Sequence, residues 1–410
     1  MTRKYSFKKE KIKILLLEGI HKSAADFFVS NGYTHIECLP NALDDEVLKE
    51  KISHANIIGI RSRTHLTKEM LKAAEKLFAI GCFSIGTNQV DGHEAKLLGI
   101  PVFNAPFSNT RSVAELVIAE CILLLRNIPA KNAAAHQGKW LKSASNSFEV
   151  RDKNIGIVGY GHIGSQVSIL AEAMGMNVYY YDIAKKLSLG KAVACASLDE
   201  LLSVAHMVTL HVPETQHTRN MIGERELAMM RKGSCLLNAA RGSVVNIAAL
   251  TKALKSGHIL GAALDVFPEE PASNNDPFIS DLQQFENVIL SPHVGGSTME
   301  AQENIGTEVA EKLVKYSDTG ATIGATNFVQ ISLQPNHNVQ RFLHIHKNEP
   351  GILKEVNYVF TSKGINIAAE YLQTDPDIGY VIVDTDSQLD SSILKNLKAI
   401  DGTIRVRMLY

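Results

Sequence analysis

The sequence has few cysteines and no long apolar run. Its five cysteines are scattered over 410 residues, no C-x-x-C pair occurs, and no histidine cluster has the spacing of a metal site. An odd number of scattered thiols argues against a disulfide framework and fits a reducing cytoplasm. The longest apolar run, residues 116–125, contains Glu120 and is too short to cross a bilayer. We therefore expect a cytoplasmic protein with no structural metal and no membrane span.

The sequence also lacks an excess of charge of either sign. It has 42 Lys and Arg against 43 Asp and Glu, a net charge of −1, which leaves no electrostatic footprint for nucleic acid or an anionic membrane. The basic segment at residues 1–13 precedes only a short apolar strand, so we interpret it as a solvated tail and not a secretory signal. The length exceeds one ordinary core, which predicts two or three domains.

A glycine-rich turn lies in the middle of the chain. Residues 155–164 read IGIVGYGHIG, an apolar strand that runs into Gly159-x-Gly161-x-x-Gly164, and a second strand at 176–181 ends in Asp182. This layout is typical of a dinucleotide-binding crossover, in which a helix N-terminus faces the pyrophosphate and the acid accepts hydrogen bonds from a ribose. A plain glycine turn between a buried strand and a helix is the alternative. Lys185 and Lys186 leave NADP open beside NAD.

The residues before this turn show their own α/β alternation. We predict strands at 13–17, 57–60, 78–81 and 102–104, helices at 23–30 and 68–74, and a long linking helix from about 112 to 134. A helix at about 298–316 is expected to return the chain to this first domain. The first, substrate domain is then discontinuous, of flavodoxin-like type, and spans residues 1–108 and 299–332.

The nucleotide domain is expected to be a Rossmann-type insertion at residues 109–298. Its predicted strands and helices alternate as in a parallel sheet covered on both faces, at 155–158, 162–174, 176–181, 198–204, 207–211, 224–230, 234–238, 246–255, 259–264 and 287–290. After a polar linker at 330–339 comes a third unit, 338–410, with a βαββαβ order typical of a ferredoxin-like module. Its predicted elements are 341–346, 350–362, 365–372, 379–384, 389–398 and 403–408.

Three loops that could carry chemistry follow predicted strands of the nucleotide domain. They bear Arg241, Glu270 and His293, and loops at the carboxyl ends of parallel strands bind ligands in open α/β sheets. Alcohol oxidation needs a base with a pKa near neutrality, such as His293, which a neighbouring carboxylate would support. A guanidinium can hold a substrate carboxylate at two points. Taken singly, the arginine could pair with a surface acid, the glutamate could be solvated, and the histidine could be an ordinary loop residue.

The ordered set GYGHIG, Asp182, NAARG, LDVFPEEP and SPHVGGST resembles the D-2-hydroxyacid dehydrogenase family over residues 11–316. The resemblance implies that Arg241 binds the substrate carboxylate, Glu270 supports the histidine, and His293 is the acid/base. It further implies an NAD cofactor. The residues expected to bind NAD are Gly159, Gly161, His162, Ile163, Gly164, Asp182, Ala239, Ala240, Arg241, Asp265, His293, Val294, Gly295 and Gly296.

The first domain is expected to supply a pocket for the rest of the substrate. Arg61 and Arg63 flank Ser62 just after a buried strand and share a face if that strand continues, so they could hold a phosphate dianion. Asn109 lies at the domain junction, and Lys142 is a weaker candidate. A solvated strand end is the alternative for the two arginines. The segments RSRTHLT, IGCFSIGTNQVD and NAPFSNTRSVAELV resemble the members of the family that act on phosphoglycerate.

The C-terminal segment HIHKNEPGIL…GINIAAEYLQT resembles an ACT domain, a module that binds amino acids between paired copies. By this resemblance His346, Asn348 and Asn366 are candidate ligands of an L-serine effector, with local turn chemistry as the alternative for the two asparagines. Pairing through this module and through the nucleotide domains would give a homotetramer. Trp140, the only tryptophan, could anchor a subunit contact or simply be exposed.

The resemblance implies NAD-dependent oxidation of 3-phospho-D-glycerate to 3-phosphooxypyruvate, the first step of L-serine biosynthesis, with feedback inhibition by L-serine at the C-terminal domain. A side activity would reduce 2-oxoglutarate to 2-hydroxyglutarate. Two alternatives stay open at this point. One is another D-2-hydroxyacid dehydrogenase, and the other is a non-catalytic corepressor or scaffold that senses NAD.

Overall fold

The computed structural model describes residues 8–271, 275–335, 339–386 and 392–409. Three predicted features extend outside these ranges: the basic N-terminal tail, the linker at 330–339 and the helix at 389–398. The chain divides into two compact units, one made of residues 1–108 with 302–410, and the other of residues 109–301. Each unit is described by itself.

The first unit contains a five-stranded parallel sheet. Its strand order is β2-β1-β3-β4-β5, the doubly wound order of flavodoxin. The strands are β1 (Lys13–Leu16), β2 (His35–Cys38), β3 (Ile57–Ile60), β4 (Ala79–Cys82) and β5 (Val102–Asn104). This confirms the flavodoxin-like prediction. The prediction had omitted the edge strand β2, whose side chains are almost all exposed and carry no apolar alternation.

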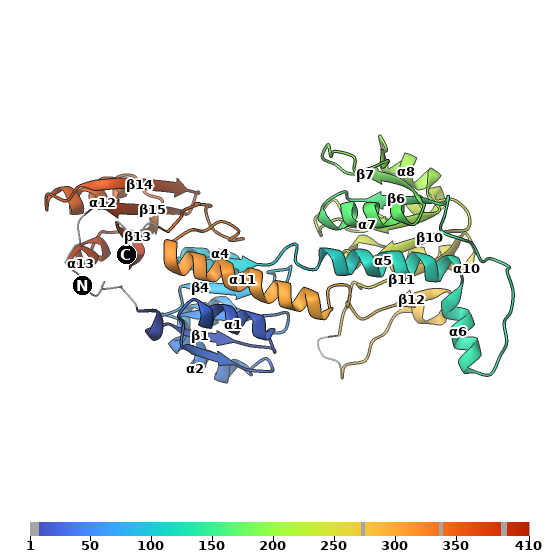
Figure 1. The fold of residues 1–410 in the computed structure, drawn as a ribbon, viewed down its shortest axis with the longest axis horizontal. Coiled ribbons are helices and arrows are strands. Elements are labelled where there is room, and N and C mark those ends of the chain that lie inside the picture. Colours follow the sequence, from blue (N-terminus) through green and yellow to red (C-terminus); the bar gives the residue numbers. More distant parts are fainter. Residues whose placement is uncertain (1–7, 272–274, 336–338, 387–391, 410) are drawn as a thin grey trace. The chain divides into compact units, whose positions relative to one another are not determined.

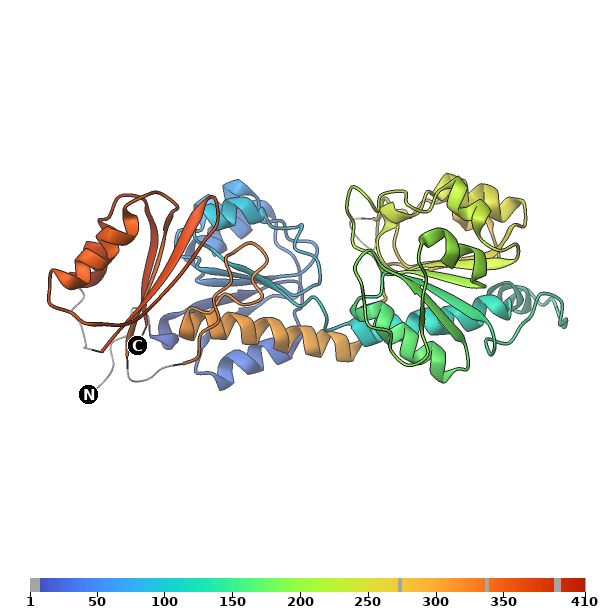
Figure 2. The same ribbon diagram turned by 90° about the horizontal axis from the view of Figure 1, so that it is seen from above.

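Helices cover both faces of this sheet (Figure 2). One face packs on α1 (Lys22–Ser30) and on α11 (Met299–Thr319), the helix that returns the chain from the second unit. The other face packs on α2 (Asp45–His54), α3 (Lys68–Ala73) and α4 (Gly92–Leu97). A short 3-10 turn, η1 (Lys9–Lys11), precedes β1. Residues on both sides of the inserted unit therefore build one core.

The second unit is built on a seven-stranded parallel sheet in the order β12-β11-β10-β9-β6-β7-β8. Counted from β6, this is the Rossmann order with one added strand, as predicted. The strands are β6 (Asn154–Val158), β7 (Asn177–Tyr181), β8 (Val193–Ala194), β9 (Met207–Leu210), β10 (Ser234–Asn238), β11 (Ile259–Leu264) and β12 (Val288–Leu290).

Apolar residues on both faces of this second sheet are buried beneath helices. The helices α5 (Thr110–Leu125) and α7 (His162–Ala173) contribute to one cluster of buried residues, and α8 (Leu198–Val204), α9 (Glu224–Met229) and α10 (Ile247–Lys255) contribute to the other. The 3-10 turns η2 (Gly242–Val244) and η3 (Asp281–Gln284) lie between strands. Because all seven strands are parallel, their carboxyl ends meet at one edge of the sheet.

The long helix predicted at 112–134 is wrong in one respect, because it is two helices. The first, α5, ends at Leu125, and α6 (Ile128–His136) begins three residues later. Asn127 between them has a left-handed backbone with φ of 49°, and Pro129 stands in the first turn of α6. Asparagine tolerates that conformation, and proline fits a helix start but not a helix interior. Both residues were visible in the sequence and indicate the break.

The C-terminal segment forms a four-stranded antiparallel sheet in the order β14-β15-β13-β16. Its elements are β13 (Gln340–Lys347), α12 (Ile352–Thr361), β14 (Ile367–Thr374), β15 (Ile378–Thr385), α13 (Ser392–Lys398) and β16 (Thr403–Leu409), as Figure 1 shows. This is the predicted ferredoxin-like arrangement. One face, with Phe342 and Val381, packs on the two helices.

The other face of the C-terminal sheet belongs to the core of the first unit, where Leu343, Ile345 and Tyr380 are buried together with residues of α1 and α11. Polar contacts reinforce this packing: the Tyr380 hydroxyl donates to the Gly320 carbonyl at 2.7 Å, and Arg405 donates to the Leu77 carbonyl at 2.6 Å. The structure therefore groups the C-terminal sheet and the five-stranded sheet into one compact unit.

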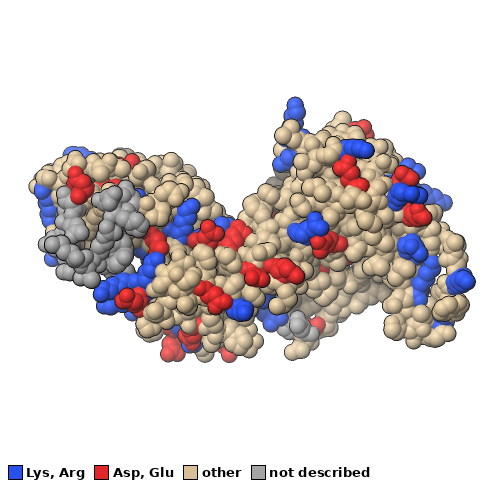
Figure 3. Space-filling model, viewed as in Figure 1, with Lys and Arg blue, Asp and Glu red and all other residues tan. Residues whose placement is uncertain are grey.

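Charged side chains of both signs are mixed on the face shown in Figure 3. Among the residues that the structure describes, no helix has the length and apolar character needed to span a membrane. Within the same ranges, no group of three His, Cys, Asp or Glu side chains is placed to hold a metal ion.

Candidate active site

The glycine-rich turn joins β6 to α7. Gly159 has φ of 92°, and a Cβ there would lie 2.4 Å from the His211 carbonyl oxygen. A Cβ at Gly164 would lie 2.2 Å from the Gly159 carbonyl oxygen, so this glycine lets the helix approach the strand. By contrast, a Cβ at Gly161 would meet nothing within 4 Å. The space above Gly161, at the start of α7, is therefore open to a pyrophosphate, with His162 and Ile163 in the first turn.

Asp182 lies directly after β7 and faces the same turn. Its carboxylate accepts the backbone N–H of Tyr160 at 2.8 Å and that of Ala184 at 2.8 Å. The acid thereby ties the glycine turn to the loop that follows β7. Lys185 and Lys186 on that loop are exposed. This placement suits a group that binds ribose hydroxyls beside the pyrophosphate.

The loop after β10 carries Ala239, Ala240 and Arg241. Asn238 shapes it, because its side chain accepts the Ala240 N–H at 3.1 Å and donates to the Arg241 carbonyl at 2.9 Å. Arg241 is half-buried, and its guanidinium donates to the Ala240 carbonyl at 2.6 Å. Asn238 is not among the residues predicted from the sequence. Its signal was available, since an asparagine that bonds the N–H two residues on is a known turn device.

Asp265 organises the loop after β12. This buried carboxylate accepts the Ser291 hydroxyl at 2.6 Å, the Val294 N–H at 2.8 Å and the Gly295 N–H at 2.7 Å. A Cβ on Gly295 would lie 2.9 Å from the Asp265 Oδ2 atom, and one on Gly296 would lie 2.3 Å from the Asn109 amide nitrogen. Hydrogen bonds to the Asp265 carboxylate thus fix the loop that carries His293.

Glu270 and His293 are the residues for which the sequence predicted that the glutamate supports the histidine. The Nδ1 atom of His293 lies 2.8 Å from the Glu270 Oε2 atom, and Glu270 Oε1 accepts the Phe267 N–H at 3.1 Å. His293 has φ of 54°, a left-handed backbone that is uncommon outside glycine. Both side chains are partly exposed. Because Nδ1 faces the carboxylate, Nε2 is the atom left to exchange a proton with a substrate.

Each member of this pair favours the charge of the other. The hydrogen bond to Glu270 raises the pKa of His293, against the opposing effect of burial. Burial alone would raise the pKa of the Glu270 carboxyl, but hydrogen bonds from His293 and from the Phe267 N–H outweigh it and lower that pKa. The positive charge of Arg241 lowers both pKa values, as the last of the causes that act on each group. The loops after β10, β11 and β12 carry Arg241, Glu270 and His293 at the same edge of the sheet, where neighbouring parallel strands end.

The candidate substrate residues are spread over the two units. Strand β3 ends at Ile60, so the condition under which Arg61 and Arg63 would share one face, a strand that continues through them, is not met. They lie in a loop in which Arg61 is half-buried and Ser62 and Arg63 are exposed. In the second unit, Asn109 is buried with its Oδ1 atom unpartnered, and Lys142 is exposed after α6.

The three candidate effector residues do not meet within one chain. His346 near the end of β13 is buried, and Asn348 just beyond it donates to the Asp375 carbonyl at 2.7 Å. Asn366 precedes β14 and donates to Asp386 at 3.0 Å. Because β13 and β14 both pair antiparallel with β15, they run parallel and start at the same end of the sheet. Asn348, after the end of β13, and Asn366, before the start of β14, therefore lie at opposite ends of the sheet.

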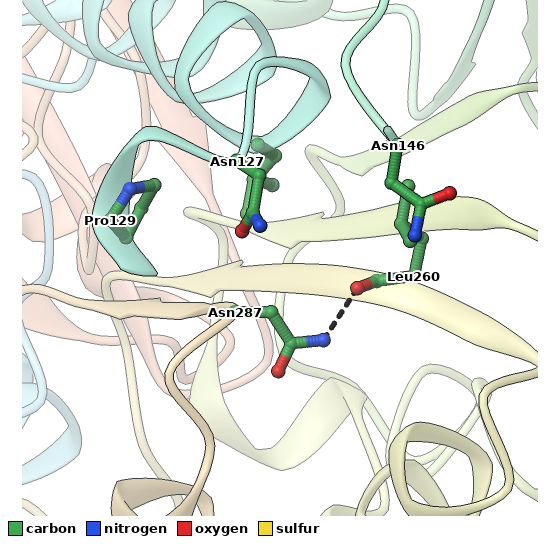
Figure 4. A pocket seen from close by; sticks show the side chains of 6 residues that line it. Asn127, Pro129, Asn146, Leu260 and Asn287 are labelled. Atoms are coloured by element: carbon green, nitrogen blue, oxygen red, sulfur yellow. Dashed lines mark hydrogen bonds between the residues drawn. The ribbon is translucent and has the colours of Figure 1, made fainter. Parts of the chain in front are cut away.

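A cavity of about 180 Å³ lies elsewhere in the second unit (Figure 4). It is lined by Leu124, Asn127, Pro129, Asn146, Leu260 and Asn287. Leu260 belongs to the first residues of β11 and Asn287 precedes β12, so this cavity is at the amino ends of the strands. Ligand chemistry in this fold takes place at the carboxyl ends, and we assign the cavity no part in the site.

Comparisons with known proteins identify the family. Residues 118–295 match the family described as D-isomer specific 2-hydroxyacid dehydrogenase, NAD binding domain, and residues 342–405 match an AHAS small subunit-like ACT domain. The D-lactate dehydrogenase of Aquifex aeolicus, solved with NAD and lactic acid, has a similar structure. The match covers 74% of this chain and 95% of the dehydrogenase, at 26% identity and a TM-score of 0.64. The chain belongs to the D-2-hydroxyacid dehydrogenase family, is an NAD-dependent oxidoreductase and carries a C-terminal ACT domain.

Within the family, the similarity is more specific. A protein of Haemophilus influenzae named D-3-phosphoglycerate dehydrogenase is 58% identical over 410 residues, which cover 100% of both chains. Its namesake in Escherichia coli K12 is also 58% identical, over 99% of this chain and 100% of its own.

Proposed function

We propose that this chain oxidises 3-phospho-D-glycerate to 3-phosphooxypyruvate with NAD, as the first step of L-serine biosynthesis. The observation that carries the proposal is the His293–Glu270 pair beside Arg241, at the strand ends next to the glycine-rich turn. The full-length similarity to proteins named D-3-phosphoglycerate dehydrogenase supports the choice of substrate.

The chemistry assigned to these residues follows from their atoms. Arg241 binds the substrate carboxylate and fixes which face of the alcohol carbon is presented. The Nε2 atom of His293 takes the hydroxyl proton as the carbonyl forms, and Glu270 stabilises the resulting imidazolium through Nδ1. Bound NAD supplies the acceptor for the hydride that leaves the same carbon. Gly161, His162, Ile163 and Asp182 would hold its pyrophosphate and ribose, and Ala239, Ala240 and the 293–296 loop would line the nicotinamide pocket.

Substrate selectivity tests the proposal. We expect NADH formation with 3-phosphoglycerate at a kcat/KM at least about tenfold above that with glycerate, because Arg61 and Arg63 would hold the phosphate. Equal kcat/KM for the two acids would overturn the phosphate assignment. Reduction of 2-oxoglutarate would be a weaker activity at the same site, since a second carboxylate would take the place of the phosphate.

We further propose that L-serine inhibits the enzyme at the ACT domain, with His346, Asn348 and Asn366 as ligands. The ACT match supports this role, and the separation of the two asparagines supports a site shared by two paired copies. Pairing of ACT domains and of nucleotide domains would give a homotetramer, and the exposed Trp140 is a candidate contact. Light scattering of the purified protein measures this state directly. The five free cysteines fit the cytoplasm as its compartment.

A further inference from the structure

Glu18 is a buried acid that the proposed mechanism does not use. It follows β1 by two residues and is 8% exposed. Its backbone is left-handed, with φ of 62°, and Gly19 after it has φ of 61°. Two consecutive left-handed residues make a sharp turn, and a non-glycine residue adopts this conformation only where its surroundings hold it. The surroundings of Glu18 therefore hold its backbone in this turn.

The carboxylate of Glu18 bonds the loop that carries the two candidate phosphate ligands. Its Oε1 atom accepts the backbone N–H of Arg61 at 3.0 Å and that of Thr64 at 3.0 Å. Its Oε2 atom accepts the N–H of Arg63 at 2.9 Å. Three main-chain donors within four residues thus converge on one carboxylate. A neutral amide could not replace it, because one of its two terminal atoms would itself be a donor.

The same loop is anchored on its other side by Gln89, whose side chain donates to the Arg61 carbonyl at 2.8 Å and to the Ser84 hydroxyl at 3.2 Å. The guanidinium of Arg61 makes only a long contact, 3.4 Å, to the Glu18 carbonyl. Across the ranges that the structure describes, neither Arg61 nor Arg63 forms an ion pair with an acid. The main chain of the loop is therefore fixed while both guanidinium groups stay available to an anion.

We propose that Glu18 is a positioning residue that sets the preference for a phosphorylated substrate by holding the Arg61–Thr64 loop. The proposal rests on the proposed function, and it assigns Glu18 no contact with substrate. The consequence is specific: loosening Glu18 lowers phosphate recognition and leaves the reacting end of the substrate untouched.

The test compares Glu18→Gln with Glu94→Gln. Glu94 is a matched control, because it is 7% exposed in the same unit and pairs with Lys68 without touching the arginine loop. We expect Glu18→Gln to raise KM for 3-phosphoglycerate about tenfold or more, with kcat/KM for glycerate and affinity for NADH little changed. In an Arg61→Ala/Arg63→Ala background the same substitution should have almost no further effect on selectivity, since the groups it positions are gone.

A Glu18→Asp variant covers the case in which Glu18→Gln does not fold, because it keeps the charge and both oxygens on a shorter arm. It should lose part of the selectivity. Two failures are distinguishable. If the wild-type enzyme does not prefer 3-phosphoglycerate, the proposed function fails and this proposal with it. If the wild type shows the preference and folded Glu18 variants keep it, or lose activity on glycerate equally, the positioning role alone is overturned.

Discussion

Asn348 and Asn366 lie at opposite ends of the C-terminal sheet, one beyond the end of β13 and the other before the start of β14. A serine ligand cannot bridge both within one chain, because strands advance about 3.3 Å per residue and β14 alone has eight residues. If both bind L-serine, each site takes Asn348 from one copy of the chain and Asn366 from the other.

This geometry predicts complementation between two variants that are each insensitive to serine. Asn348→Ala and Asn366→Ala should each abolish most serine inhibition when pure. In a mixed pair one site carries both substitutions and the other carries neither, so co-expressed subunits should regain part of the inhibition. Serine titration of NADH formation measures it, with the pure variants as controls. Mixed enzyme as insensitive as the pure variants would contradict the shared site.

The His293–Glu270 pair predicts a pH effect. Glu270 raises the pKa of His293, and oxidation needs the neutral imidazole, so kcat/KM should rise as pH increases through that raised pKa. Glu270→Gln should move this rise to lower pH, towards the ordinary histidine value of about 6.5, and reduce the plateau about 10- to 100-fold. The adjacent, exposed Glu269→Gln is the control and should leave the profile unchanged. If the pH profile of Glu270→Gln is not shifted, Glu270 does not set the pKa of the catalytic base.

Gly161 and Gly223 predict opposite outcomes for the same substitution. Each glycine directly precedes a helix, and neither has a left-handed backbone. A Cβ at either position would have no neighbour closer than 3.4 Å. Gly161→Ala should therefore fold normally but place a methyl group in the space that we propose for the pyrophosphate, which would raise KM for NAD by about tenfold or more. Gly223→Ala should leave KM for NAD unchanged. If Gly161→Ala binds NAD as tightly as the wild type, the pyrophosphate does not bind at this turn.

Lys96 on α4 predicts an acid-sensitive contribution to stability. Its ammonium lies 3.1 Å from Asp375 and also contacts Asp377, both in the turn between β14 and β15. Burial would raise the pKa of Asp375, but backbone N–H groups and Lys96 outweigh it and lower that pKa. The stabilisation is therefore present above the unfolded carboxyl value, about 3.9, and is lost as pH falls through the lower folded value.

Thermal unfolding of Lys96→Met measures this contribution. The variant should melt a few degrees below the wild type at pH 7, in keeping with about 1 kcal/mol for a partly buried ion pair. The difference should shrink as the pH falls through the lowered folded pKa of Asp375, because that carboxyl is then protonated in both proteins. Lys68→Met, which removes a more exposed partner of Glu94, is the control. A difference that does not depend on pH would indicate packing by the Lys96 stem instead.

The sequence predicted the parts of the site that depend on local pattern. Gly159, Gly161 and Gly164 follow a strand and open a helix, and Arg241, Glu270 and His293 follow strands whose shared edge is a property of parallel sheets. Glu18 could not be found in this way. Its partners lie 43 to 46 positions away, and no spacing rule connects a turn residue with the backbone of a distant loop. The break at Asn127 was missed for a different reason, because apolar periodicity outweighed an asparagine and a proline that indicate it.

The path of α11 has a consequence for how the protein is made. Ile305, Val309 and Leu313 of this helix complete the same core as Ile14 and Leu16 of β1, although about 290 residues separate them. On a ribosome, the second unit, 109–301, is complete before the core residues Ile305, Val309 and Leu313 of that helix are synthesised. Domains fold as units during synthesis, so the nascent chain should hold a folded insert while one face of the first sheet still lacks helix α11. The segment made first is thus among the last to reach its native packing.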